Sequence, residues 1–443
     1  MAELYDVVIV GAGPAGAIAA KIAGENGLKA AIIERKTDIS AIRRICTMIV
    51  NVDELNVGDI LTYSHKTKRF IFPRNGFSFS YTGPTRNVYG FHLITPGGMR
   101  IEMGNVPKGK AENNVVGLMI HKGIMCQQLV DEAKQYGVHV FVNTNINSVR
   151  KEPGYVALLD NRGNEYRGKF VIAADGVNSR IARLLGMDKD RIFIGTYRDM
   201  ARTYEGYEVP DEDALLFGLG WETGISLAPE MTPGHLHVAA TSYNYTDDLD
   251  AQIEKFVTSG TYAPWFKKAR EVPGHRASCV SNIASPIVIP FKDNVLLAGD
   301  SSWMQETGIN GALMPGWSAA NAITEAVLTG QINRQGVAQY LSWYDTNWYQ
   351  PWGKRLANSG GADMKQYLSG EDIDYLASLV GESLPATMNF FTILKQIGTT
   401  FAELLPQIQD ERPDIMQRLL GYRSHPRALA LAKRRNEGCA IVS

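Results

Sequence analysis

The hydrophobic pattern near the N-terminus predicts a strand, a helix and a second strand in quick succession. A β-branched, apolar run over residues 5–11 predicts a strand buried on both faces of a parallel sheet. Small residues over 17–23 predict a helix that packs closely on this sheet. A second apolar run over 29–33 predicts a neighbouring strand that ends at Glu34. This order is typical of an α/β fold with a doubly wound sheet.

The turn between the first strand and the helix is rich in glycine. It reads Gly11-Ala12-Gly13-Pro14-Ala15-Gly16. Gly11 permits the tight turn, Gly13 lets the backbone approach a pyrophosphate, and Gly16 allows close packing of helix and strand. The helix N-terminus offers N–H groups to phosphates, and Glu34 stands where a carboxylate can accept hydrogen bonds from an adenosine ribose. The sequence therefore predicts a dinucleotide-binding site.

Two later apolar runs also predict buried strands, and each leads into a pair of one glycine and one aspartate. Residues 170–176 read Phe-Val-Ile-Ala-Ala-Asp-Gly, and residues 294–300 read Asn-Val-Leu-Leu-Ala-Gly-Asp. Ahead of them, apolar spacing over 121–136 predicts a helix, which Gly137 ends and a strand over 138–142 follows. The alternation of strands and helices thus extends beyond the N-terminal motif.

The middle of the chain, residues 190–285, lacks this alternation. Short antiparallel strands are predicted instead, separated by turns rich in Gly, Pro and Asp. We place them at 192–196, 214–217, 224–228 and 235–241, and we place a further hairpin within 86–105. His235 and His237 lie two apart on one of these strands, but their sequence neighbourhood supplies no third ligand, so no metal site is predicted.

Aromatic side chains gather at near-helical spacing in residues 338–352. We expect a helix face packed on the nucleotide-binding part, with the wall of an apolar substrate cavity as the alternative. Helices are expected over 364–435, including the mostly apolar segment 389–405. Packing within the protein is the expected use of that segment. Capping a substrate tunnel and lying on a bilayer surface are the alternatives.

Composition narrows the class of protein. The 443 residues are enough for two or three domains, and the net charge of −1 excludes a strongly cationic nucleic-acid binder. No apolar run of about 18 residues predicts a membrane span, and no signal peptide is expected. Four widely spaced cysteines form no Cys-x-x-Cys pair, which disfavours a zinc ribbon, an iron–sulfur cluster and a disulfide scaffold. We expect a cytoplasmic protein, with peripheral membrane contact as an alternative.

The N-terminal motif, Asp175-Gly176 and Gly299-Asp300, in this order, resemble a large flavoprotein superfamily. It is the p-hydroxybenzoate hydroxylase-like superfamily, which includes aromatic hydroxylases and geranylgeranyl reductases. The resemblance implies a Rossmann-type FAD/NAD(P)-binding fold with an inserted antiparallel substrate-binding sheet and a helical C-terminal region. The implied parts are an FAD-binding domain of 1–85, 106–188 and 286–363, a substrate-binding sheet of 86–105 and 189–285, and helices over 364–443.

The same resemblance implies where FAD binds. Asp300 is expected near the ribityl chain and pyrophosphate, and Lys122 replaces an arginine usual at the start of the helix beside the phosphates. A loop over 307–313 is expected to pass the isoalloxazine and lead into a helix beginning near Met314. The implied cofactor-binding residues are Gly11, Gly13, Pro14, Ala15, Gly16, Glu34, Arg35, Lys122, Gln127, Asp175, Gly299, Asp300, Gly308, Asn310, Gly311 and Ala312. For Gln127, a solvated helix face is the alternative.

Three details of the motifs favour the reductase branch. Arg183 follows Ser179 by four residues, as in geranylgeranyl reductases, whereas hydroxylases usually have an arginine three residues on. The Ala-Ala-His and paired prolines that hydroxylases carry after Gly-Asp are missing. Reductases also carry a cysteine where Cys46 stands, although a buried structural cysteine is the alternative. Their usual flavin loop is altered at 306–311 and their Tyr-x-Trp-x-Phe-Pro strand is only echoed at 220–229, which leaves the isoprenoid substrate open.

The resemblance therefore predicts an FAD-dependent oxidoreductase that reduces C=C bonds of a hydrophobic substrate by hydride transfer from reduced flavin. An FAD-dependent monooxygenase using NAD(P)H and O2, of the aromatic or polyketide type, is the first alternative, and a non-catalytic electron carrier is the second. Cys46 and His92 are the candidate catalytic residues. Electrons are expected from an external reductant, either NAD(P)H or a ferredoxin- or flavodoxin-like protein. No nucleic-acid partner is expected.

Overall fold

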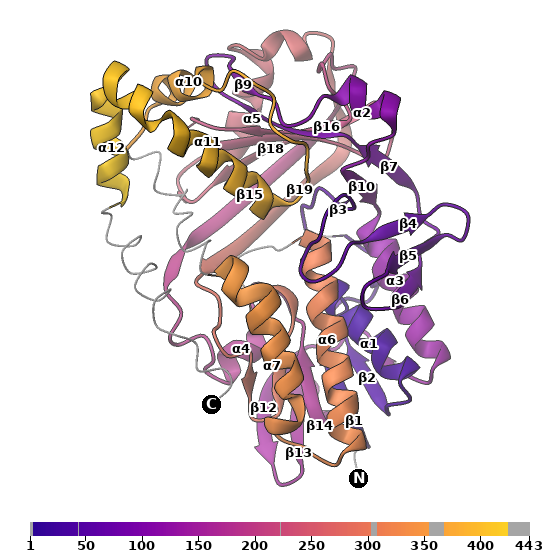
Figure 1. The fold of residues 1–443 in the computed structure, drawn as a ribbon. Coiled ribbons are helices and arrows are strands. Elements are labelled where there is room, and N and C mark those ends of the chain that lie inside the picture. The colour runs from indigo at the N-terminus through magenta and orange to yellow at the C-terminus, as the bar shows by residue number, and fades with distance from the viewer. Residues whose placement is uncertain (1–2, 43, 222, 303–307, 354–366, 424–443) are drawn as a thin grey trace.

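The computed structural model describes residues 3–42, 44–221, 223–302, 308–353 and 367–423. Figure 1 shows a lower part, in which helices pack on a mostly parallel sheet, and an upper part built around a second large sheet. Helices of the C-terminal segment lie at the upper left, beside this second sheet. The chain therefore combines an α/β layer structure with an antiparallel sheet, as the sequence predicts.

The lower sheet has eight strands. Six follow the order β11-β2-β1-β14-β13-β12, and β21 pairs with β14 and with β20. Its strands are β1 (Leu4–Val10), β2 (Ala30–Ile33), β11 (His139–Phe141), β12 (Ile146–Glu152), β13 (Tyr155–Asp160), β14 (Glu165–Ala173), β20 (Phe291–Lys292) and β21 (Val295–Leu297). Val10 pairs in parallel register with both Ile33 and Ala173. The carboxyl ends of three strands therefore meet at the glycine turn, where ligands bind in open α/β sheets.

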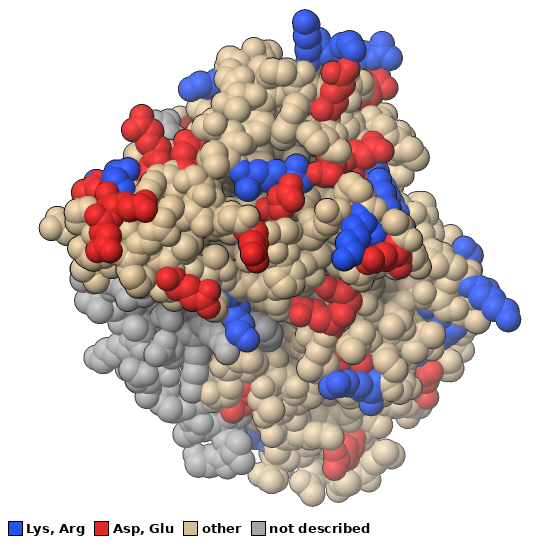
Figure 2. Space-filling model, turned by 45° about the horizontal axis from the view of Figure 1, so that its top comes forward, with Lys and Arg blue, Asp and Glu red and all other residues tan. Residues whose placement is uncertain are grey.

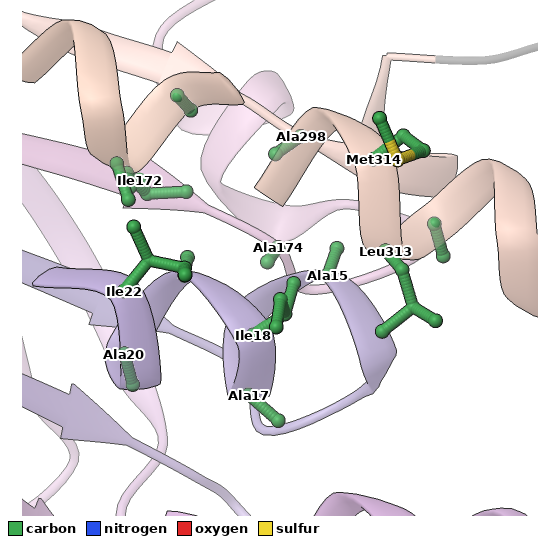
Figure 3. Close-up of a cluster of buried hydrophobic side chains, with 14 of the residues drawn as sticks. Ala15, Ala17, Ile18, Ala20, Ile22, Ile172, Ala174, Ala298, Leu313 and Met314 are labelled. Atoms are coloured by element: carbon green, nitrogen blue, oxygen red, sulfur yellow. The ribbon is translucent and has the colours of Figure 1, made fainter. Parts of the chain in front are cut away.

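Three helices cover this sheet beside the turn. They are α1 (Pro14–Glu25), α3 (Lys122–Gln135) and α6 (Gly308–Leu328). Small side chains let α1 and α6 approach closely, and Figure 3 shows Ala15 and Ile18 of α1 facing Leu313 of α6. A Cβ added at Gly316 would lie 2.1 Å from the carbonyl oxygen of Ala15. Gly316 is thus required by the packing of the two helices, a role that the sequence analysis did not anticipate.

The upper sheet has seven strands in the order β19-β15-β18-β17-β16-β8-β9. They are β8 (Gly90–Ile94), β9 (Arg100–Ile101), β15 (Phe193–Glu205), β16 (Ala214–Gly218), β17 (Gly224–Pro229), β18 (His235–Ser242) and β19 (Arg270–Ala284). Successive side chains point to opposite faces. Leu236 and Val238 pack with Ile253 of α5 (Leu249–Thr258) on one face, whereas Phe91 and Leu93 pack with Ile393 on the other.

Two small sheets and a short helix connect these parts. One sheet has the order β3-β10-β7, and the other has the order β4-β5-β6. The elements are β3 (Ile49–Asn51), β4 (Thr62–Ser64), β5 (Arg69–Phe72), β6 (Phe77–Ser80), β7 (Thr85–Val88), α2 (Val106–Glu112) and β10 (Gly117–Ile120). Phe77 stacks on Trp317 of α6 with ring centroids 5.3 Å apart. This contact attaches the second small sheet to the lower sheet and its helices α1, α3 and α6. Because they carry the predicted dinucleotide-binding turn, these elements are called the nucleotide-binding layer below.

The remaining helices include the predicted aromatic and apolar segments. They are α4 (Arg180–Leu184), α7 (Ala338–Tyr344), α10 (Gly370–Ser378), α11 (Phe390–Glu411) and α12 (Pro413–Arg423), with a π-helical turn over Asp345–Gly353 and 3-10 turns at Ala263–Phe266, Gly299–Ser301 and Gln335–Val337. Tyr340, Tyr344 and Trp348 are buried in the core that α1 and α6 share. The expected packed helix face is confirmed. In the described part of the chain, every helix is too short or too polar to cross a membrane.

The structure corrects two expectations about elements. The segment Gly308–Leu313 is helical, because α6 begins at Gly308 rather than near Met314; Thr307 lies outside the described residues. β15 covers 13 residues and β19 covers 15, much longer than the short strands expected. β19 is an edge strand with a Pro, a Gly and mostly exposed side chains, so its sequence lacks the apolar alternation that reveals a strand. The strands expected near 214, 224 and 235 and the hairpin within 86–105 are confirmed.

Candidate cofactor and active site

The glycine turn between β1 and α1 has little room on one side and open space on the other. Gly11 has φ +101°, and a Cβ there would lie 2.4 Å from the carbonyl oxygen of Ala174. A Cβ on Gly16 would lie 1.8 Å from the carbonyl oxygen of Gly11. At Gly13, which caps α1 ahead of Pro14, a Cβ would meet no atom of the described part of the chain within 4 Å. The helix N-terminus therefore faces a space that phosphates can enter.

Glu34 holds this turn from the end of β2. Its Oε2 accepts a hydrogen bond from the amide of Ala12 at 2.7 Å, and its Oε1 accepts one from the amide of Lys36 at 2.9 Å. The side chain is buried beside the turn, whereas the next residue, Arg35, is exposed. A carboxylate fixed here fits the predicted contact with a ribose hydroxyl.

Asp175 joins the site through its backbone, while its side chain has another task. A Cβ on Gly11 would lie 3.1 Å from the Cα of Asp175. The carboxylate accepts hydrogen bonds from Ser179 Oγ at 2.6 Å and from the amides of Arg180 and Ile181 at 2.7 and 3.1 Å. Burial raises the pKa of this carboxyl, against the effect of these hydrogen bonds. The side chain thus secures the start of α4.

The Gly299–Asp300 turn packs against the same place. Gly299 has φ +70°, and a Cβ there would lie 2.9 Å from the Cβ of Ala15 and 3.7 Å from that of Ala312. The turn therefore fits between the first residues of α1 and α6, and Asp300 lies half-buried within it. Segments distant in the sequence, around residues 15, 299 and 312, are thereby brought into contact.

The side chain of Asn310 is hydrogen-bonded to the protein backbone. Its Oδ1 accepts a hydrogen bond from the amide of Asn51 at 3.0 Å, and its Nδ2 donates one to the carbonyl oxygen of Asn51 at 2.9 Å. This reciprocal pair joins the first turn of α6 to β3. Gly308 begins the helix with φ +72°, and no atom of the described residues lies within 4 Å of where its Cβ would be, whereas Gly311 is buried.

The N-terminus of α3 lies under the loop that follows β2. His121 caps the helix by accepting a hydrogen bond from the amide of Ile124, and Lys122 is its first residue. A Cβ on Gly123 would lie 1.9 Å from the carbonyl oxygen of Ser40, so only glycine allows this approach. Gln127 is half-buried and donates a hydrogen bond to Asp131 one turn further on.

Cys46 lies in the segment that joins the two large parts. The neighbouring Ile45 is buried against Ala201 of β15 and Ala239 of β18. The Sγ of Cys46 accepts a hydrogen bond from the amide of Met48 at 3.4 Å, and the thiol is only half-buried. This position, between the nucleotide-binding layer and the upper sheet, is compatible with the predicted role.

His92, the other catalytic candidate, is buried in β8. Its Nδ1 accepts a hydrogen bond from the amide of Met103 at 3.2 Å, and its Nε2 lies 3.9 Å from a carboxylate oxygen of Asp211. Burial and the nearby Arg100 lower its pKa to about 4, against the opposing effect of Asp211. Met103, Asp211 and Arg100, the neighbours of His92 among the described residues, all belong to the upper sheet or its connections.

Asp53 was missed by the sequence analysis because it belongs to no motif. It follows β3, and Asn51 Nδ2 donates a hydrogen bond to its Oδ1 at 2.5 Å. Its side chain keeps an exposed surface, but partial desolvation and the neighbouring Glu54 carboxylate raise its pKa to about 7. Asn51 is also hydrogen-bonded to Asn310 in the first turn of α6, so a single residue links the Asp53 carboxyl group to the start of that helix.

Comparisons with known proteins agree with this geometry. A family described as an FAD binding domain matches residues 4–51. The digeranylgeranylglycerophospholipid reductase of Thermoplasma volcanium is 26% identical over 429 residues, which cover 92% of this chain and 99% of the relative. The reductase of the same name from Methanococcus vannielii is 25% identical over 86% of this chain and 92% of its own length.

Solved structures show the same fold. A geranylgeranyl bacteriochlorophyll reductase-like protein from Thermoplasma acidophilum has a TM-score of 0.72 at 24% identity, covering 93% of this chain and all of that one. The flavin-dependent halogenase CmlS has a TM-score of 0.60 at 16% identity, covering 89% of this chain and 70% of that one. The solved structures thus share the fold of this chain, and the family match at the glycine turn supports FAD as the cofactor of this flavoprotein class.

Within that class, the chain resembles one family along nearly its whole length. The comparisons confirm the resemblance to the FAD-dependent oxidoreductases of the geranylgeranyl reductase family. FAD also fits the described residues, because Gly13 leaves room for a pyrophosphate and Glu34 offers a fixed carboxylate beside it. The reductase branch is favoured over the monooxygenase branch.

Proposed function

We propose that the protein reduces C=C bonds in the prenyl chains of a lipid, with FAD as its resident cofactor. The observation that carries this proposal is the similarity to a digeranylgeranylglycerophospholipid reductase over 92% of this chain and 99% of the relative. Bound FAD, once reduced, would supply a hydride to the double bond. An external reductant, NAD(P)H or a ferredoxin- or flavodoxin-like protein, would supply the electrons.

The nucleotide-binding layer would hold the cofactor through backbone groups. The amides at the N-terminus of α1 are proposed to bind the pyrophosphate, and Glu34 is proposed to bind the ribose. The N-terminus of α6 is fixed by Asn310, and its positive dipole end would stabilise negative charge on the reduced flavin. Lys122 would add a positive point charge beside the phosphates. Each of these groups thus has a proposed role in the predicted cofactor site.

The upper sheet, β8, β9 and β15–β19, is proposed as the substrate-binding domain. Ile45, Ala201 and Ala239 form a small apolar cluster where this sheet meets the nucleotide-binding layer. Cys46, adjacent to this cluster, remains our candidate for a residue near the reacting bond. Asp53, which is linked through Asn51 to the first turn of α6, is our candidate for the proton donor. His92 is less suitable, since its pKa of about 4 leaves it neutral.

We further propose that the protein acts in the cytoplasm, at the surface of the membrane that holds its lipid substrate. The lipid named in the relatives supports this proposal. α11 also supports it, because it starts with an exposed phenylalanine, Phe390, at 40% exposure. Figure 2 shows Lys and Arg side chains interspersed with Asp and Glu on the face in view, so attraction to anionic headgroups there would be weak.

The reaction can be tested with the flavin reduced in advance. The protein would be loaded with FAD, photoreduced without oxygen and mixed with a geranylgeranyl lipid. We expect reoxidation of the flavin and a lipid product that is heavier by two hydrogen atoms for each double bond reduced. Reoxidation only by O2, with a hydroxylated product, would instead support the monooxygenase. A reduced protein that no prenyl, quinone or aromatic acceptor reoxidises would support the electron carrier.

A further inference from the structure

A compact group of imidazole and carboxylate side chains lies on the upper sheet. Glu230 directly follows β17, His235 begins β18 and His275 belongs to β19. Each of the three offers one ligand atom, and these atoms all lie within 4.8 Å of one another. The sequence analysis predicted no third ligand near His235. The fold, however, places Glu230 across a turn and His275 from a distant strand beside His235.

A bulge in β19 explains how His275 reaches this place. In the pairing of β15 with β19, Tyr204 lies opposite Glu271 and Arg202 lies opposite Arg276. Residues 272–275 therefore stand opposite the single residue Thr203. Gly274 takes φ +78° within this bulge, a conformation that favours glycine. Bulges of this kind redirect a side chain, and here the side chain is a histidine beside a second histidine.

Neighbouring groups orient the Glu230 carboxylate. Its Oε1 accepts a hydrogen bond from Thr203 Oγ1 at 2.5 Å and lies 3.3 Å from His237 Nδ1. Its Oε2 lies 3.8 Å from His235 Nδ1. That nitrogen is buried and has no hydrogen-bond partner among the residues that the structure describes. One carboxylate oxygen is thus held by outer groups while the other points toward an imidazole nitrogen in need of a partner.

The charges around the group favour a cation. Glu205 lies 4.0 Å from the Nε2 of His235, and Arg270 neutralises it with an ion pair at 2.6 Å. Arg86 donates to the backbone carbonyl of Glu230 and is itself paired with Asp213. Both arginines are therefore paired with carboxylates other than that of Glu230.

We propose that Glu230, His235 and His275 bind a divalent transition-metal ion of the zinc class. Two imidazole nitrogens and one carboxylate oxygen form a donor set that zinc uses with one position left for water. Magnesium and calcium prefer sites made of oxygen atoms, so they fit less well. His275 is exposed and can move the short distance that close coordination requires. The ion would fasten the β19 bulge to the turn between β17 and β18.

The proposal is independent of the reductase activity and can be tested on the FAD-loaded full chain. The protein would be stripped with a chelator and titrated with Zn²⁺ by calorimetry, beside His275→Ala and the control His65→Ala. His65 is an exposed histidine in the turn after β4, away from the group. We expect one high-affinity zinc per chain in the wild type and in the control, and at least tenfold weaker binding in His275→Ala.

Cobalt provides a second measurement that does not depend on stability. Co²⁺ added to the stripped wild type should give the visible absorption of a tetrahedral site, and His235→Ala and His275→Ala should both lose it. Zinc should also raise the Tm of the wild type but not of His275→Ala. Equal zinc affinity in His275→Ala and the wild type, or no stoichiometric binding in the wild type, would overturn the proposal.

Discussion

The nucleotide-binding layer and the upper sheet position their functional groups in different ways. In the first, parallel strands end together, and the groups that face the open space at Gly13 are backbone amides at a helix N-terminus. In the second, the polar groups are side chains, such as Glu230 and His275, carried by strands far apart in the sequence. A backbone site depends on glycines and leaves a local sequence motif. A side-chain site depends on register and leaves none.

The largest effects are expected from two substitutions in the glycine turn. One of them disturbs packing, and the other affects contact with the ligand. Gly16→Ala would place a Cβ 1.8 Å from the Gly11 carbonyl oxygen, so we expect little folded protein. Gly13→Ala meets nothing within 4 Å, so the FAD-free variant should keep the wild-type Tm yet bind FAD much more weakly. Thermal unfolding with and without FAD measures both. Equal FAD affinity in Gly13→Ala and the wild type would place the pyrophosphate elsewhere.

The next effect concerns the pair that joins α6 to β3. Asn310→Ala removes two buried hydrogen bonds and leaves the amide of Asn51 without its acceptor. We expect a loss of about 2 kcal/mol in the free energy of unfolding, measured by denaturant titration. Asn321→Ala, on the same helix, also removes two hydrogen bonds, one half-buried and one exposed, and serves as the control for loss of buried bonds. If the two variants are equally stable, the pair does not fix the start of α6.

A smaller effect depends on pH and on Asp53. Its pKa is raised to about 7 in the folded protein, from an ordinary value near 3.8. The folded state therefore holds this proton more tightly than the unfolded state, and stability is lost as pH rises from about 4 through 7. Asp53→Asn removes this loss, so its Tm relative to the wild type should be higher at pH 8 than at pH 5. A constant difference across this range would show that the carboxyl is not perturbed.

The opposite sign is expected for His92. Burial and Arg100 lower its pKa to about 4, so the folded state releases a proton that the unfolded state holds below about pH 6.5. The stability associated with neutral His92 is therefore present above pH 6.5 and lost as pH falls through 4. His92→Gln should flatten this acid-side loss of Tm, with little change at pH 8. If His92→Gln strongly slows the reoxidation of the reduced flavin by the lipid at pH 8, His92 would again be a catalytic candidate.

The sequence predicted the nucleotide-binding layer well, because its geometry follows from local rules. A glycine turn after a buried strand needs Gly11 and Gly16 wherever it occurs, and both meet backbone atoms as expected. The start of α6 was placed too late, since Pro315 and Gly316 look like a helix boundary but lie inside the helix. Pro315 is tolerated within the helix, and Gly316 is needed for the contact with Ala15.

Side-chain roles in this layer were harder to predict. Asp175 and Asn310 stand at motif positions, yet their side chains form hydrogen bonds within the protein, to Ser179 and to Asn51. The group around Glu230 could not be predicted, because the bulge in β19 that carries His275 depends on pairing between strands distant in sequence. Periodicity reveals which face of an element is buried. It does not reveal which distant strand lies beside it.

The central claim is that backbone groups from three distant segments form one FAD site. Its most direct test is the flavin content of the purified protein, measured from its visible absorption after incubation with FAD and gel filtration. We predict one FAD per chain in the wild type, with a large loss in Gly13→Ala at unchanged FAD-free Tm. A wild-type protein that stays colourless after this treatment would contradict the claim.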